Sequence, residues 1–228
     1  MHEGHRDRVK KRFRQEGLDH FSDIQALELL LFYGIPRVDT NPIAHALLDR
    51  FGSLSQVLEA SPEELMKVPG VGENAALLLT LIPQMGRFYM VDRSSRVTIL
   101  QTLEQCANFL VPHFFGRKVE TVFILCLDAK CKLLCCKELG EGGPNSTGVS
   151  IRKIVETAIG VNAATVVLAH NHPSGLAVPS AEDIQTTRRI AHALQAAEIT
   201  LADHIIVADG DYVSIAMSDD RFRDCLLI

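Results

Sequence analysis

The spacing of apolar residues changes near residue 95, and this change limits the folds that the chain can adopt. Between residues 21 and 90 the apolar residues recur at helical spacing, as in SDIQALELLLFYG, whereas later segments alternate between β-rich runs and amphipathic stretches. The polar stretch VDRSSRVTILQ separates the two patterns. We therefore predict a small all-α domain over residues 1–93 and an α/β domain over residues 98–228.

The second half alternates strands with helices. The runs VETVFILCLD and LLCCKEL flank the turn AKCK, which predicts an antiparallel hairpin. IRKIVETAIGVN is amphipathic and predicts a helix before the strand ATVVLAHNH. A further amphipathic helix over SAEDIQTTRRIAHALQAAE precedes ITLADHIIVADGDYVSI, which predicts two strands around Asp209 and Gly210.

Composition and charge narrow the classes of protein. With 47% hydrophobic and 22% charged residues among 228, the chain is typical of a packed globular protein. No apolar run approaches the roughly 18 residues that span a bilayer, and the N-terminus lacks the apolar centre of a secretory signal, so we expect a cytoplasmic protein without membrane contact. The net charge of −5 argues against a general polyanion binder. Six basic residues near the N-terminus leave a solvated helix face and phosphate contact both open: Arg6, Arg8, Lys10, Lys11, Arg12 and Arg14.

Four of the six cysteines lie in the stretch CLDAKCKLLCC. They lack the paired two-residue gaps of a zinc ribbon. In a hairpin, Cys135 and Cys136 would point to opposite faces of the sheet. This pattern favours buried free thiols in a reducing compartment over a metal site.

The stretch LAHNHPSGLAVPSAED carries the strongest chemical signal. Residues two apart on a strand share a face, so His170 and His172 can direct their imidazoles to one point at the end of an apolar run. Asp183 follows early in the next helix and can supply an oxygen ligand. Three such ligands leave one zinc position open for water, which is typical of a catalytic site.

The same residues also fit an arrangement without metal. Ser180 and Asp183 are three apart at a helix start, which is the spacing of a capping box, and the histidines could be hydrogen-bonded beside a turn. The residues alone therefore leave a metal site and a capped helix both open.

A family resemblance favours the metal site. The spacing from His170 to Asp183 resembles the MPN or JAMM metalloprotease pattern: an upstream Glu, then His, any residue, His, seven residues, Ser, two residues, Asp. LAHNHPSG, PSAED and LADHIIV resemble motifs of the bacterial RadC-like family. The likeness to this family runs along nearly the whole chain. The resemblance implies a three-layer, cytidine-deaminase-like α/β domain with one Zn²⁺ per chain, held by His170, His172 and Asp183. It also implies hydrolysis of an amide bond in a protein or peptide, and a link to DNA repair or recombination.

The resemblance also implies roles for further residues. The family's EEL strand end corresponds to KEL here, which makes Glu138 the expected general base towards the water and general acid towards the leaving amine. Spacing alone does not select Glu138 over Glu141. Ser180 is expected to donate to the developing oxyanion. Two positions depart from the family pattern. Glu141 stands where a basic residue is common, and SIRK stands where His-Pro-Arg-Glu is common. These departures put substrate recognition in doubt.

The stretch LMKVPGVGENAALLL, near residues 66–80, resembles a helix-hairpin-helix. Gly70 and Gly72 would let the backbone turn so that N–H groups face a DNA phosphate. Glu73 follows directly and would repel phosphate, so DNA contact and simple helix packing both stay open. The alternative functions are a DNA-binding repair protein with a structural or vestigial zinc, and a metal-dependent nuclease. The sequence does not decide whether His204 assists the site or only packs.

Overall fold

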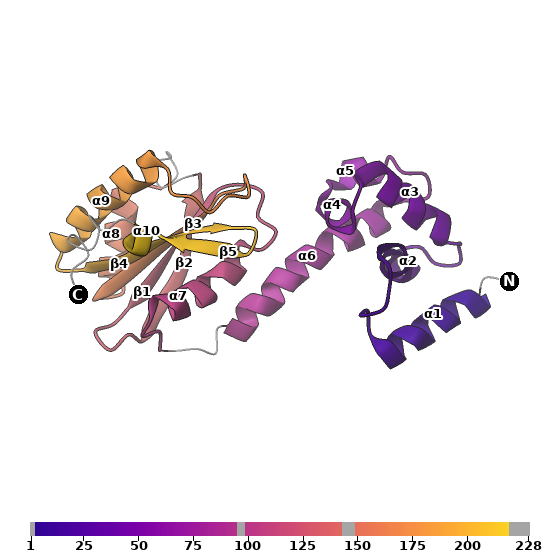
Figure 1. Ribbon diagram of the computed structural model, residues 1–228, viewed down its shortest axis with the longest axis horizontal. Coiled ribbons are helices and arrows are strands. Elements are labelled where there is room, and N and C mark those ends of the chain that lie inside the picture. Colours follow the sequence, from indigo (N-terminus) through magenta and orange to yellow (C-terminus); the bar gives the residue numbers. More distant parts are fainter. Residues whose placement is uncertain (1–2, 95–98, 143–148, 219–228) are drawn as a thin grey trace. The chain divides into compact units, whose positions relative to one another are not determined.

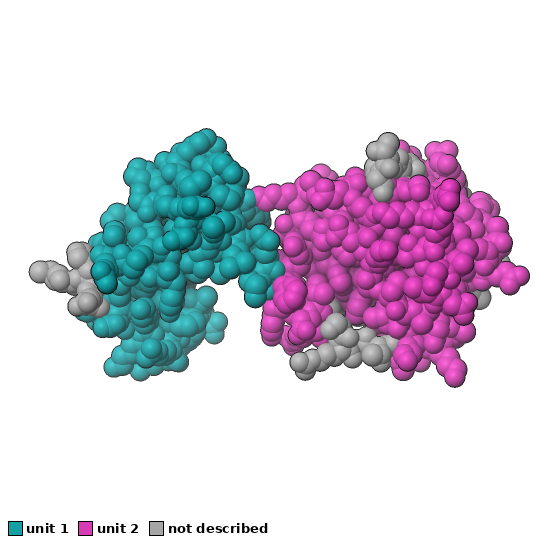
Figure 2. All heavy atoms as spheres, turned by 180° about the vertical axis from the view of Figure 1, so that it is seen from behind, with its two compact units in different colours: residues 1–86 teal, residues 87–228 magenta. Residues whose placement is uncertain are grey.

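The computed structural model describes residues 3–94, 99–142 and 149–218. The chain divides into two compact units, Met1–Gly86 and Arg87–Ile228, which Figure 2 colours separately. The predicted boundary lies between residues 93 and 98, and residues 95–98 lie outside the described residues. Among the described residues, no helix is long and apolar enough to cross a membrane.

The first unit is all-helical, as the helical spacing of its apolar residues predicted. Its helices are α1 (Glu3–Glu16), α2 (Asp23–Gly34), α3 (Asn41–Phe51), α4 (Leu54–Glu59), α5 (Pro62–Leu65) and the first part of α6 (Glu73–Ser94). Helix α2 begins with a complete capping box between Ser22 and Gln25. The core is built from fully buried leucines on α2, α3, α5 and α6: Leu27, Leu31, Leu47, Leu65 and Leu79.

Two residues of the basic N-terminal run bind carbonyl groups within the first unit. The Arg6 guanidinium lies over the ring of Phe32 and donates to the carbonyl of Ile35 at 2.8 Å, just beyond the end of α2. Arg12 donates to the carbonyl of His20 at 2.6 Å. These two side chains hold α1 against the rest of the unit, whereas three others of the run are exposed: Arg8, Lys11 and Arg14.

The two glycines of the predicted hairpin differ in whether a side chain could be added there. Gly70 has φ +90°, and a Cβ there would lie 2.7 Å from Cδ1 of the buried Ile43, whereas a Cβ at Gly72 would have no atom within 4 Å. Left-handed backbone costs a non-glycine residue on the order of 1–3 kcal/mol. We expect Gly70→Ala to lower the free energy of unfolding by about that much, and Gly72→Ala to change it little. Thermal melting followed by circular dichroism checks this, and equal melting temperatures would contradict it.

The second unit contains a mixed sheet with the strand order β2-β1-β3-β4-β5 (Figure 1). The strands are β1 (Thr121–Leu127), β2 (Leu133–Glu141), β3 (Thr165–Asn171), β4 (Thr200–Ala208) and β5 (Asp211–Ser214). β1 and β2 form the predicted antiparallel hairpin, and β4 and β5 turn at Asp209 and Gly210, both with positive φ. Only the neighbours β3 and β4 run parallel in this sheet of described strands.

Helices cover both faces of the sheet and confirm the predicted three-layer α/β domain. α8 (Ile151–Gly160) and α9 (Ala181–Gln195) pack on one face, with α10 (Ile215–Ser218). The other face is covered by α7 (Leu103–Leu110) and the 3-10 helix η1 (Val111–Phe114). α7 is not among the predicted helices, although Thr102 and Gln105 form a capping box at its start.

The described cysteines are free thiols on both faces of the sheet. Cys126 and Cys135 pack towards α8 and α9, whereas Cys136 packs towards α7, so Cys135 and Cys136 do point to opposite faces. Among the described residues, the only cluster of possible metal ligands contains no cysteine. The prediction of free thiols is therefore confirmed for these residues, but of the four cysteines in the hairpin only Cys126 is buried, and the other three are half-buried.

Burial should also make two of these thiols unreactive. It raises the pKa of Cys106 to about 11, and it raises the pKa of Cys126 further. Because the thiolate is the reacting form, we expect iodoacetamide at pH 8 to modify both residues far more slowly in the native protein than in guanidinium. Mass spectrometry of the labelled peptides measures this. Native labelling at the rate of the unfolded chain would contradict the burial of these side chains.

Candidate metal centre

The two histidines of the HNH stretch lie at the end of β3 and face the same side of the sheet. His172 continues the pairing with β4, because its N–H donates to the carbonyl of Val207 at 2.8 Å. The Nε2 atoms of His170 and His172 are 3.0 Å apart. The side chain of His170 is fully buried and that of His172 is 19% exposed. The structure thus brings together the pair that the sequence singled out.

The other ring nitrogen of each histidine is bound to the protein. His172 Nδ1 lies 3.1 Å from the carbonyl oxygen of Leu176, and since a carbonyl only accepts, Nδ1 carries the hydrogen. His170 Nδ1 lies 2.8 Å from Nε2 of His204. Burial lowers the pKa of His204 well below its usual value, which keeps this ring neutral. The Nε2 atoms of His170 and His172 are therefore the ones available to a cation.

Asp183 combines the two roles that the sequence left open. Ser180 and Asp183 form a complete capping box at the start of α9, with Ser180 N–H donating to Oδ2 of Asp183 at 2.8 Å and Ser180 Oγ donating to the same oxygen at 2.5 Å. The carboxylate also lies 3.3 Å from Nε2 of His170 and 3.6 Å from Nε2 of His172. Asp183 is thus the helix cap and a neighbour of both histidines.

The Asp183 carboxyl is held in its charged form. Burial by itself would raise its pKa, but hydrogen bonds from His170 and Ser180 outweigh burial and hold the pKa well below its usual range. A negative charge therefore lies beside two imidazole nitrogens.

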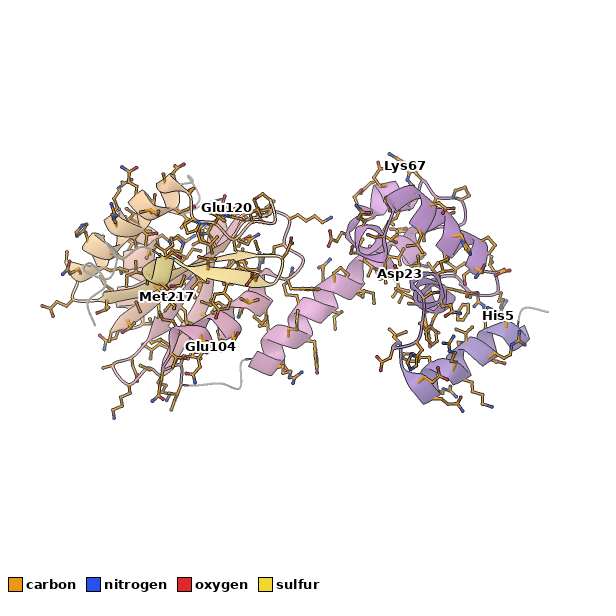
Figure 3. The ribbon with its side chains drawn as sticks, in the orientation of Figure 1. His5, Asp23, Lys67, Glu104, Glu120 and Met217 are labelled. Atoms are coloured by element: carbon orange, nitrogen blue, oxygen red, sulfur yellow. The ribbon has the colours of Figure 1, made fainter. Side chains whose placement is uncertain are left out.

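A second carboxylate, which is not among the predicted site residues, lies beside the two histidines. Glu120 directly precedes β1 (Figure 3), and its Oε1 lies 3.7 Å from Nε2 of His170. Its side chain is 34% exposed. Val122 is the antiparallel partner of His170, and Glu120, two residues earlier, shares the face of Val122. Ligand atoms of Glu120, His170 and His172 all lie within 4.8 Å of one another.

Asn171, between the two histidines, fixes the backbone around Glu120. Its side chain points to the opposite face and is almost fully buried. Its Oδ1 accepts from the N–H of Thr121 at 2.8 Å, and its Nδ2 donates to the carbonyl of Val119 at 3.2 Å. The carbonyl of Glu120 itself accepts from the N–H of Gly142 at 2.7 Å. The position of Glu120 is therefore determined by the end of β3 and the end of β2.

Glu138, the expected general base, does not lie with the histidines. It pairs with Phe123, whose side chain packs in the core beneath α7, so Glu138 faces the side of the sheet opposite His170. Its carboxylate accepts from Arg117 at 2.7 Å and is 41% exposed. This placement corrects the expectation for Glu138. The strand alternation of β2 places it with Cys136 on the face towards α7.

The residues that depart from the family pattern have local structural roles. Ser150 caps α8 by accepting from the N–H of Lys153 at 3.2 Å. The Lys153 ammonium donates to the carbonyl of Leu139 in β2, so it links α8 to the strand that carries Glu138 and Glu141. Residues 143–148 of the neighbouring loop lie outside the described residues.

Gly70 and Gly72 lie between α5 and α6 in the first unit. The buried Val68 and Val71 anchor this turn in the core of the unit. The structure contains no nucleic acid, and the DNA contact expected for the two glycines stays a prediction.

The donor set fits a zinc ion. Two imidazole nitrogens and two carboxylates converge, and nitrogen and oxygen donors of these kinds are common zinc ligands. Two Nε2 lone pairs facing each other at 3.0 Å repel unless a proton or a cation lies between them. The rings are also oriented by hydrogen bonds at Nδ1, as in many metal-binding histidines.

Comparisons with known proteins agree with this fold and site. The family model described as the RadC-like JAB domain matches residues 100–220, and the model described as the UPF0758 N-terminal domain matches residues 3–77. The fold and the candidate metal centre therefore define the second unit as a JAB domain.

Relatives extend the match to nearly the whole chain. UPF0758 proteins of Paraburkholderia xenovorans and Fusobacterium nucleatum are 33% and 32% identical over 92% and 93% of this chain, and the matches cover 83% and 94% of those proteins. One from Paraburkholderia phytofirmans is 34% identical over 92% of this chain and 81% of its own length. The chain belongs to the family of RadC-like JAB-domain proteins with a UPF0758 N-terminal domain.

Proposed function

We propose that this protein is a zinc-dependent hydrolase that cleaves an amide or isopeptide bond in a protein or peptide. The observation that carries the proposal is the convergence of the Nε2 atoms of His170 and His172 with the carboxylates of Asp183 and Glu120. The JAB domain supports it, because the resemblance to the JAMM pattern implies this chemistry.

In this proposal, His170, His172 and Asp183 hold one zinc ion per chain. Asp183 is the better ligand of the two carboxylates because it is more buried and is fixed by Ser180. Three protein ligands leave one coordination position open. When bound, zinc lowers the pKa of water towards about 7 and polarises a carbonyl oxygen.

Glu120 takes the role of general base in place of Glu138. Its carboxylate borders His170 and is the more exposed of the two carboxylates, so it can meet water and substrate. It would accept a proton from the attacking water and then donate that proton to the leaving amine. Asn171 and Gly142 hold its backbone for this role.

Ser180 first acts through Asp183. Its Oγ donates to Asp183 Oδ2 and accepts from the N–H of Asp183 at 3.1 Å, so its only proton is engaged in the capping box. Donation to the developing oxyanion requires Ser180 to exchange this hydrogen bond during the reaction.

The test begins with the full-length protein stripped of metal by a chelator. Calorimetric titration with Zn²⁺ should give one site per chain. The zinc-loaded protein is then incubated with a panel of peptides and isopeptide-linked substrates, and released amines are measured. We expect release that stops on chelation and returns with added zinc.

Two results would contradict the proposal. Failure of the wild-type protein to bind zinc would exclude the metal centre. Zinc-dependent cleavage of phosphodiesters without any amide cleavage would identify a nuclease with the same site, because zinc-activated water is not restricted to carbonyl chemistry.

A further inference from the structure

His204 is a buried polar residue to which the proposed reaction assigns no step. It lies in β4 and is fully buried between His170 and Thr187. Its Nε2 is 2.8 Å from Nδ1 of His170, and its Nδ1 is 2.5 Å from the hydroxyl of Thr187. The same hydroxyl donates to the backbone carbonyl of Asp183 at 2.6 Å. A continuous series of hydrogen bonds therefore joins His170 to Asp183.

An irregularity in β4 places His204 on the face of the site. Val166 pairs with Leu201 and Val167 pairs with Asp203, so Ala202 is an extra residue in the parallel ladder. Beyond this bulge, His204 pairs with Leu168 and shares the face of His170. Without the extra residue, strand alternation would turn His204 towards α7. Bulges often redirect a side chain next to a functional site.

The direction of each hydrogen bond in the series follows from the group at its end, the carbonyl of Asp183. The Asp183 carbonyl only accepts, so the Thr187 hydroxyl donates to it and accepts from Nδ1–H of His204. Nε2 of His204 then has no hydrogen and accepts from Nδ1–H of His170. With its hydrogen at Nδ1, His170 can present its Nε2 lone pair to a cation beside His172 and Asp183.

We infer that His204 and Thr187 are positioning residues that hold His170 as the Nδ1–H tautomer and so present its Nε2 to the metal. The inference rests on the proposed zinc site. The series ends at a backbone carbonyl, which has no proton to exchange, so it orients His170 and does not conduct protons. The series of hydrogen bonds also connects the two proposed ligands. The backbone carbonyl of Asp183 accepts a hydrogen bond from Thr187, and its carboxylate lies beside His170.

The chain offers a matched pair of variants for the test. Thr187→Val removes the hydroxyl that links His204 to the carbonyl of Asp183 while nearly keeping the volume of the side chain. Thr186→Val is the control, because Thr186 is equally buried and its Oγ1 has no hydrogen-bond partner among the described residues. Loss of a partner that orients a ligand typically lowers metal affinity by roughly 10–100-fold. We expect that loss in Thr187→Val and none in Thr186→Val, measured by chelator competition at fixed pH.

Two further variants separate orientation from packing. His204→Gln keeps an acceptor and a donor in the buried position, whereas His204→Phe keeps a ring without nitrogen atoms. We expect His204→Gln to retain more zinc affinity than His204→Phe, with circular dichroism confirming that both are folded. Equal affinity in these two variants would mean that His204 only fills space.

A spectroscopic measurement tests the tautomer without metal. ¹⁵N NMR of histidine-labelled apo protein should show Nδ1 protonated in both His170 and His204, and Nε2 unprotonated in His204. A hydrogen at Nε2 of His204, or none at Nδ1 of His170, would overturn the inference even if zinc binds. Equal zinc affinity in the two threonine variants would also overturn it and leave the zinc site intact, whereas a wild-type protein that binds no zinc would overturn the proposed function itself.

Discussion

Glu120→Gln should abolish hydrolysis while one zinc ion per chain stays bound. The amide keeps the size of the side chain but cannot take a proton from water or return it to the leaving amine. General acid–base groups typically contribute about 100-fold to 10,000-fold to the rate, and we expect kcat to fall within that range. Amine release measures kcat, and elemental analysis of the same sample measures zinc. Loss of zinc together with activity would instead identify Glu120 as a ligand.

Glu138→Gln is the matched control on the neighbouring strand. It removes the charge that pairs with Arg117, on the face of the sheet opposite His170. Because this ion pair is partly exposed, its loss should have only a small effect on stability. We expect kcat to stay within a few-fold of wild type. A loss of activity in Glu138→Gln, with Glu120→Gln fully active, would contradict the assignment of the base.

His172→Ala and Asp183→Asn should both lose the metal. His172→Ala removes one of the two converging Nε2 atoms, and Asp183→Asn removes the negative charge but keeps an oxygen that can accept from the N–H of Ser180. We expect zinc affinity to fall by more than the roughly 100-fold that is typical for losing a partner outside the ligand set. Zinc is measured by elemental analysis after dialysis.

His192→Ala provides the control for histidine loss. His192 lies on α9, the helix that contains Asp183, but its side chain is exposed. The variant should retain one zinc per chain. If His172→Ala kept its zinc as His192→Ala does, the metal would bind elsewhere and the proposed centre would be wrong.

Local patterns were sufficient to predict part of this site. The two-residue spacing of His170 and His172 predicted a shared face, and the strand continues far enough for that to hold. The spacing of Ser180 and Asp183 predicted a capping box, which the structure contains. These predictions depend on regular geometry within one element or across one turn.

Glu120 could not be found in the same way, because its position depends on strand pairing over long sequence distances. It is near His170, which comes 50 residues later in the chain, only because β1 pairs with β3 in a particular register. The pairing of β2 with β1 likewise determines the face of Glu138. The bulge at Ala202 has no clear sequence signal, so simple alternation along β4 would have turned His204 the wrong way.

The end of β3 uses its two faces for different purposes. On one face, His170 and His172 bring their Nε2 atoms together, and on the other the side-chain amide of Asn171 binds the backbone of Val119 and Thr121. In the proposed function, two of the three metal ligands and the residue that positions the base are thus three consecutive residues. If the proposed function holds, a descendant of this protein that changed only Asn171 would keep its metal and lose its turnover, and so pass in a single step from an enzyme to a binding protein.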